Sequence, residues 1–171
     1  MENLRVMSFD LDSFTLIKSK VERSKRVIDY VRNLDVDLAL LQGDNNLIYN
    51  TVVEDNEYAK IYNYLNYLFL MKPDLVFVDD YLQYDCGGYI TRFANGEDLA
   101  FYNVKKYNKE SLSGFKRVFK EYENIDYKVL AGTLQDVNID DFCKKYSLDN
   151  ICSEPRSNHI LVSKGLDARG V

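Results

Sequence analysis

Short apolar runs alternate along this chain with amphipathic stretches, and the two patterns predict different elements. The apolar runs are four to six residues long, the length of a strand that is buried on both faces of a sheet. They predict strands at residues 4–9, 38–41, 75–78, 127–131 and 159–162. Residues 89–93 and 99–104 predict a β-hairpin, because the dipeptide Asn95-Gly96 between them favours a tight turn.

The amphipathic stretches predict helices. Ser19 and Glu22 have the spacing of a capping box, which predicts a helix over residues 19–34. Residues 109–123 carry an apolar stripe at helical spacing, and Asn138 is suited to cap a short helix after it.

The composition of two further segments also predicts their structure. Residues 56–71 are rich in Tyr and Leu and stop before Pro73, which predicts another helix. Residues 81–88 predict a loop that turns at Gly87-Gly88. Helices that alternate with buried strands around a hairpin indicate one α/β domain over residues 1–171, with a mixed sheet.

Composition narrows the classes of partner. The net charge is −5 with a pI near 5.0, whereas proteins that bind the phosphate backbone are usually basic, so nucleic acid is an unexpected partner. Three cysteines without a CxxC pair indicate a reducing compartment and no zinc site, and we expect a cytoplasmic protein. The apolar stretch at residues 58–71 is interrupted by Lys60, Asn63 and Asn66, so no membrane span is predicted.

Five segments, in order, resemble the endonuclease/exonuclease/phosphatase family, whose patterns are LRVxSxN, DxDxxxLQE, NxH, VLxGDxN and DHIxVS. The segments are LRVMSFDL at residues 4–11, DVDLALLQG at 35–43, LAFYNVK at 99–105, VLAGTLQDV at 129–137 and NHILVS at 158–163. The resemblance implies an α/β sandwich of mixed sheets flanked by helices, trimmed at its C-terminal end.

The same resemblance implies a metal-dependent phosphoesterase or nuclease site, and most of its positions are altered in this chain. The corresponding residues are Asp10, Gln42, Gly43, Asn103, Lys105, Thr133, Gln135, Asn158 and His159. Gly43 stands where the family has a metal-binding glutamate, and Lys105 stands where it has a histidine. Thr133 and Gln135 replace the aspartate and asparagine of GDxN, and Asn158 replaces an aspartate. The closing Asp-His pair of the family would lie beyond Val171.

These departures predict a catalytically inactive relative without a cofactor that binds a protein partner or forms a homodimer. We expect the contact near residues 159–162 or the Tyr-rich segment 56–71, where trimming would leave a sheet edge or an apolar face uncovered. One alternative is an active phosphoesterase or nuclease with a rebuilt Mg²⁺ or Mn²⁺ site that uses Asp10, Asp12 and Asp136. Another is a haloacid-dehalogenase-like phosphatase, because Phe9-Asp10-Leu11-Asp12 resembles the first motif of that family.

Overall fold

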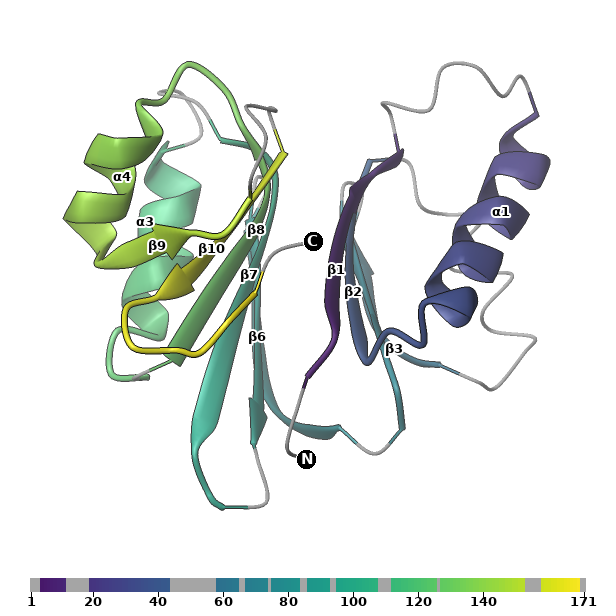
Figure 1. Ribbon diagram of the computed structural model, residues 1–171, viewed down its shortest axis with the longest axis horizontal. Helices are drawn as coiled ribbons and strands as arrows, with labels where there is room; N and C mark the ends of the chain where they lie inside the picture. Colours follow the sequence, from purple (N-terminus) through teal and green to yellow (C-terminus); the bar gives the residue numbers. More distant parts are fainter. Residues whose placement is uncertain are drawn as a thin grey trace.

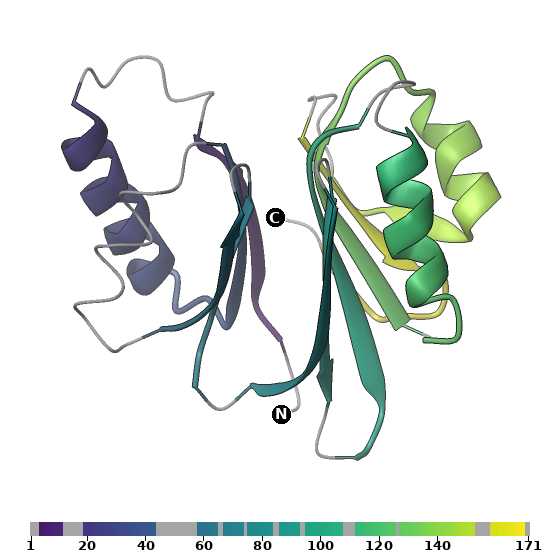
Figure 2. The same cartoon turned by 180° about the vertical axis from the view of Figure 1, so that it is seen from behind.

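Two β-sheets pack face to face, and helices cover their outer faces, in a computed structural model of the chain (Figure 1). The structure describes residues 4–11, 19–43, 58–64, 67–73, 75–83, 86–92, 95–107, 112–125, 127–152 and 158–169. Helix α1 lies on one side of the sandwich, and α3 and α4 lie together on the other side (Figures 1 and 2). The predicted α/β sandwich with mixed sheets is confirmed.

Sheet 1 has four strands in the order β1-β2-β4-β3. Their bounds are Val6–Asp10 for β1, Leu38–Gln42 for β2, Ala59–Tyr64 for β3 and Tyr67–Met71 for β4. β1 and β2 are parallel, and the other pairs are antiparallel.

Helix α1 (Lys20–Asn33) connects the two parallel strands and covers the outer face of sheet 1. It begins as predicted, with the Ser19 side chain accepting a hydrogen bond of 3.3 Å from the Glu22 amide. The Glu22 carboxylate pairs with Arg26 one turn further along, at 2.6 Å.

The helix predicted over residues 56–71 is wrong, because the described parts of this segment form β3 and β4. β4 lies between β2 and β3 in sheet 1, and its buried side chains are apolar on both faces of the sheet. Leu68 and Leu70 pack under α1, while Phe69 and Met71 pack between the sheets. An apolar run that is buried on both faces lacks the alternation that identifies a half-exposed strand, so it can be mistaken for part of a helix.

Sheet 2 has six strands in the order β5-β6-β7-β8-β10-β9. Their bounds are Val76–Gln83 for β5, Cys86–Arg92 for β6, Asp98–Tyr107 for β7, Tyr127–Leu134 for β8, Leu148–Asn150 for β9 and Asn158–Ser163 for β10. β7 and β8 are parallel, and the other pairs are antiparallel. The predicted hairpin at Asn95-Gly96 joins β6 to β7, and Gly96 adopts a φ of +89°.

Helices α3 (Leu112–Glu121) and α4 (Ile139–Tyr146) cover sheet 2, and Asn138 caps α4 as predicted. The predicted turn at Gly87-Gly88 is wrong, because both glycines lie within β6. A Cβ atom on Gly88 would come within 2.5 Å of Tyr122 and 2.8 Å of Val118. Gly88 therefore allows the α3 region to approach the sheet closely, rather than turning the chain.

The expected open edge along residues 159–162 is also wrong, because β10 is an interior strand. It pairs with β8 on one side and, from Leu161 to Ser163, with β9 on the other. The Ile151 amide adds a hydrogen bond of 3.1 Å to the Ile160 carbonyl. Within the described ranges, no helix is long and apolar enough to cross a membrane.

Candidate functional site

The polar residues of the site lie at one end of the inter-sheet space. Apolar side chains fill the middle of this space, with Leu40 of β2, Phe101 of β7 and Ala131 of β8 among them. Side chains of a strand alternate between its faces, so the inward position two residues further along each strand belongs to the same space. Those positions are occupied by polar residues: Gln42, Asn103 and Thr133.

We define the strand-end site as Asp10, Gln42, Asn103, Thr133 and Asn158. Asp10 ends β1 in register with Gln42 on the parallel strand β2. Thr133 is the register partner of Asn158, the first residue of β10. All five are site positions predicted from the sequence, and the structure brings them to the same end of the sandwich.

Thr133 connects the two sheets through its hydroxyl group. Its Oγ1 lies 2.7 Å from Asn158 Oδ1, within sheet 2, and 3.3 Å from Asp10 Oδ2, across the sandwich. A hydroxyl carries one proton, so Thr133 donates to one of these oxygens at a time. The Thr133 residue is only 4% exposed, so this network is screened from water on the Thr133 side.

Gln42 and Asn103 form a second connection, and both are fully buried. Gln42 Nε2 donates to Asn103 Oδ1 at 2.8 Å and to the Leu40 carbonyl at 2.9 Å, and it lies 3.2 Å from Ser8 Oγ. Asn103 Nδ2 donates to the carbonyls of Leu41 and Leu68 at 3.1 and 3.3 Å. Most donors and acceptors of the two amide groups are therefore already occupied by other groups of the protein. The part played by Ser8 was missed, although its place two residues before Asp10 on the same face was a usable signal.

Two glycines at the site have backbone conformations that restrict substitution. Gly43 has a φ of +101° and Gly132 a φ of +139°, in the region that favours glycine. A Cβ atom on Gly132 would lie 1.8 Å from the Val104 carbonyl oxygen. Gly43 thus does more than omit a carboxylate, because its backbone also disfavours the glutamate that the family pattern has there.

The other predicted residues occupy further positions on these strands or beside them. Asp136 is exposed on the turn before α4, with a φ of +55°. His159 alternates onto the opposite face from Asn158 and Ile160, the face where Leu161 packs beneath the helices. Gln135 is partly buried just after β8, and Lys105 is partly buried near the end of β7. Asp12 lies outside the described residues.

The described residues do not fit the divalent metal that the family pattern implies. Magnesium and manganese prefer several oxygen ligands with carboxylates among them. The strand-end site offers the single carboxylate of Asp10. No group of three His, Cys, Asp or Glu residues that could hold a metal occurs among the described residues. Gln42 Oε1 is buried and accepts no hydrogen bond in the described part of the chain, but one neutral oxygen does not replace a carboxylate.

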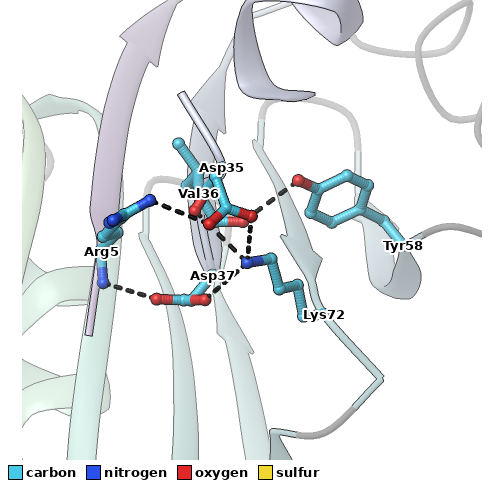
Figure 3. Close-up of polar contacts among 6 residues, drawn as sticks. All are labelled: Arg5, Asp35, Val36, Asp37, Tyr58 and Lys72. Atoms are coloured by element: carbon cyan, nitrogen blue, oxygen red, sulfur yellow. Dashed lines mark hydrogen bonds and ion pairs between the residues drawn. The ribbon is translucent and has the colours of Figure 1, made fainter. Parts of the chain in front are cut away.

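A second polar cluster, which the sequence analysis missed, lies at the opposite end of sheet 1 (Figure 3). The Lys72 ammonium lies 2.6 Å from Asp35 Oδ1 and 2.9 Å from Asp37 Oδ1. Arg5 donates from its guanidinium to Asp35 at 2.9 Å and from its backbone amide to Asp37 at 2.8 Å. We call these four residues the charged clamp, because they join the starts of β1 and β2 to the end of β4.

The charged clamp shifts the pKa values of its members. The hydrogen bond from Lys72 lowers the pKa of Asp35 below its ordinary value of 3.8, and Arg5 contributes in the same direction. The hydrogen bonds to Asp35 and Asp37 raise the pKa of Lys72. The charged side chains of the clamp are therefore paired with one another.

The sequence matches no protein-family model and no curated protein. Solved structures do match the fold. An endonuclease/exonuclease/phosphatase family protein from Bacteroides thetaiotaomicron aligns with a TM-score of 0.73 and 14% identity, over 94% of this chain and 83% of that one.

Two eukaryotic structures are also similar. The catalytic domain of human Nocturnin with bound sulfate aligns with a TM-score of 0.69 and 11% identity, over 94% of this chain and 82% of that one. D. rerio TDP2 complexed with a single-strand DNA product aligns with a TM-score of 0.65 and 10% identity, over 98% of this chain and 86% of that one. At these identities the similarity concerns the fold.

Proposed function

This chain has the endonuclease/exonuclease/phosphatase fold, and we propose that it is a catalytically inactive protein with that fold that acts by binding another protein chain. The observation that carries the proposal is that the groups of the strand-end site do not fit a divalent metal. Asp10 is its one carboxylate, and that carboxylate contacts the hydroxyl of Thr133. Hydrolysis of a phosphate ester by the family route needs a metal and a base for the attacking water.

The backbone at Gly43 supports the proposal independently of the side chains. Its φ of +101° disfavours a side chain at the position where the family pattern has a metal-binding glutamate. Side-chain amides at Gln42 and Asn103 bind each other and nearby carbonyl groups. The amide side chains at these family-site positions therefore form hydrogen bonds between the two sheets.

Charge and exposure support a protein as the partner. A net charge of −5 opposes binding to a polyanion, although one structure with this fold, D. rerio TDP2, is complexed with single-strand DNA. Tyr30 of α1 is 52% exposed, and Leu34, which caps the end of the helix four residues later, is 45% exposed. Tyrosine is enriched in protein interfaces, so we propose this part of α1 as the contact. It replaces residues 159–162, which lie on an interior strand, while the Tyr-rich segment 56–71, whose strand β3 is an edge of sheet 1, stays a second proposed contact.

The second candidate is a metal-dependent phosphoesterase or nuclease with a rebuilt site. The observation that favours it is the position of Asp10 at the end of β1, beside Thr133 and with Gln42 in register. The haloacid-dehalogenase-like alternative loses its basis, because the fold is the two-sheet sandwich of the matched structures.

One assay separates the two candidates. The purified chain is incubated with single-strand DNA, abasic duplex DNA and a generic phosphodiester, in Mg²⁺, in Mn²⁺ and in EDTA. For each substrate, we expect the same background rate of hydrolysis in Mg²⁺, in Mn²⁺ and in EDTA. Calorimetry should detect no heat of metal binding. Metal-dependent turnover that disappears in Asp10→Ala would establish the second candidate.

The binding part of the proposal needs its own measurement. Light scattering over a range of concentrations reports a homodimer, and capture from host extract followed by binding of the purified partner reports a heterocomplex. Tyr30→Lys should weaken either complex, whereas Val76→Lys is a matched control on β5, since Val76 is 56% exposed and lies on sheet 2. A monomer without a partner, or equal effects of both variants, would contradict the proposed surface.

A further inference from the structure

The apolar core between the two sheets ends before the strands do. Leu40, Phe101 and Ala131 are inter-sheet core residues, and the next inward positions on their strands are polar. On β10 the same change occurs between Ile160, which packs against the core, and Asn158. Apolar packing therefore does not hold the sheets together at the strand-end site, and buried polar groups there are costly unless they are hydrogen-bonded.

Hydrogen bonds cross between the sheets at this level. Asp10 of sheet 1 contacts Thr133 of sheet 2 at 3.3 Å. Gln42 of sheet 1 donates to Asn103 of sheet 2 at 2.8 Å, and Asn103 donates back to two carbonyl groups of sheet 1. Thr133 and Asn103 lie on neighbouring strands, β8 and β7, so the two connections are close together.

We propose that the contact between Asp10 and Thr133 joins the two sheets at the strand-end site without a metal. We call this contact the lock. Asn158 Oδ1 lies 2.7 Å from the Thr133 hydroxyl within sheet 2, so it competes with Asp10 for the hydroxyl proton. This inference rests on the proposed function in one respect, because a metal bound by Asp10 would compete with Thr133 for the same carboxylate. Thr133 stands where the family pattern has an aspartate, so the substitution that removes a site acid also supplies the hydroxyl of the lock.

A double-mutant cycle tests the lock. The unfolding equilibrium is measured in urea with EDTA for the unmodified chain, Asp10→Ala, Thr133→Val and the double variant. A hydrogen bond to a charged group predicts that Thr133→Val raises the unfolding constant by about tenfold. We expect a smaller effect of Thr133→Val in the Asp10→Ala background, because only the contact with Asn158 is then left to lose. Equal effects of Thr133→Val in both backgrounds would overturn the lock.

Two variants keep the test interpretable. Thr91→Val removes another buried threonine hydroxyl of sheet 2, which donates to the Val76 carbonyl at 2.8 Å within the same sheet. Its effect should be the same with and without Asp10→Ala. Thr133→Ser keeps the hydroxyl and should retain the coupling to Asp10, which covers the case in which Thr133→Val fails to fold.

Hydrogen exchange gives a second readout. Loss of the lock should speed exchange of the amides of β1 and β10 in Thr133→Val but not in Thr133→Ser, and equal exchange in the two variants would count against it. The proposed function fails separately: if Mg²⁺ shifts the unfolding midpoint of the unmodified chain but not that of Asp10→Ala, a metal site exists. The coupling measured in EDTA still decides the lock.

Discussion

Thr133 Oγ1 and Asp10 Oδ2 lie 3.3 Å apart, although 123 residues separate them along the chain. One residue belongs to sheet 2 and the other to sheet 1, so their distance reports how the sheets are placed against each other. The neutral amide of Asn158 shares the same hydroxyl at 2.7 Å. The hydroxyl has a single proton, so the amide oxygen of Asn158 and the carboxylate of Asp10 compete for it.

Asn158→Asp, which restores the family aspartate, should therefore destabilise the chain at neutral pH. Two carboxylates around one hydroxyl repel each other, and the pKa of one of them rises. We expect a loss of about 1–3 kcal/mol in the free energy of unfolding at pH 7. Because a raised carboxyl pKa means that the charged form is the unfavourable one, the loss should shrink as pH falls through that pKa.

Urea unfolding at pH 7 and at about pH 4.5, near the ordinary glutamate and aspartate range, measures this dependence. Asn150→Asp is the matched control, since Asn150 is exposed and the variant also adds one negative charge. A loss for Asn158→Asp that is equal at both pH values would contradict the prediction.

Gly43→Glu should not create an active metal site. The side chain would occupy a residue with a φ of +101°, at a cost of about 1–2 kcal/mol. We expect a lower urea midpoint and no turnover with Mg²⁺ or Mn²⁺. Gly43→Ala should cost about the same if the backbone is the reason. Activity that appears in Gly43→Glu would mean that this single position had silenced the site.

Gly132→Ala should be severely destabilising. Its Cβ atom would lie 1.8 Å from the Val104 carbonyl oxygen, so β7 and β8 would have to separate. We expect a loss of about 3 kcal/mol, or failure to fold. Gly96→Ala is the control, because Gly96 also has a positive φ, of +89°, but nothing lies within 4 Å of its added Cβ. Thermal unfolding compares the two, and similar losses would show that backbone strain alone is responsible.

Asp35→Asn should reduce the acid sensitivity of the chain. Lys72 lowers the pKa of Asp35 below 3.8 in the folded state. The stabilisation from this pair is present above that ordinary value and is lost as pH falls through the lowered pKa. We therefore expect Asp35→Asn to be less stable at pH 7 and the difference to vanish in acid, measured by urea unfolding from pH 7 to about pH 2. Asp35 is exposed, so added salt should also reduce the difference; a salt-independent loss at pH 7 would contradict this account.

The residues of the strand-end site could be predicted because strands end in order along the chain. Asp10, Gln42 and Thr133 each follow an apolar run, and the resemblance to a known family aligned those runs with one another. The hydrogen bonds between them could not be predicted, because they depend on how sheet 1 and sheet 2 are placed against each other. The same limit explains why the contact of Ser8 with Gln42 was missed.

The errors in the fold have a related cause. Leu68 and Phe69 are adjacent and both fully buried, on opposite faces of β4, so the local pattern carries no period by which to recognise a strand. The pair Gly87-Gly88 predicts a turn because glycine favours turns, yet Gly88 lies within β6 and lets Tyr122 approach that strand. Both features are set by packing partners that are distant in the sequence.

Each sheet is built from one uninterrupted stretch of chain, since β1 to β4 form sheet 1 and β5 to β10 form sheet 2. The polypeptide crosses from one sheet to the other once among the described strands, between Met71 and Val76. A chain cut there and produced as two separate polypeptides should therefore reassemble, because each fragment exposes an apolar face that only the other fragment covers. Co-expression with a tag on one fragment would recover both in equal amounts, and Phe101→Glu on the inner face of sheet 2 should abolish their association.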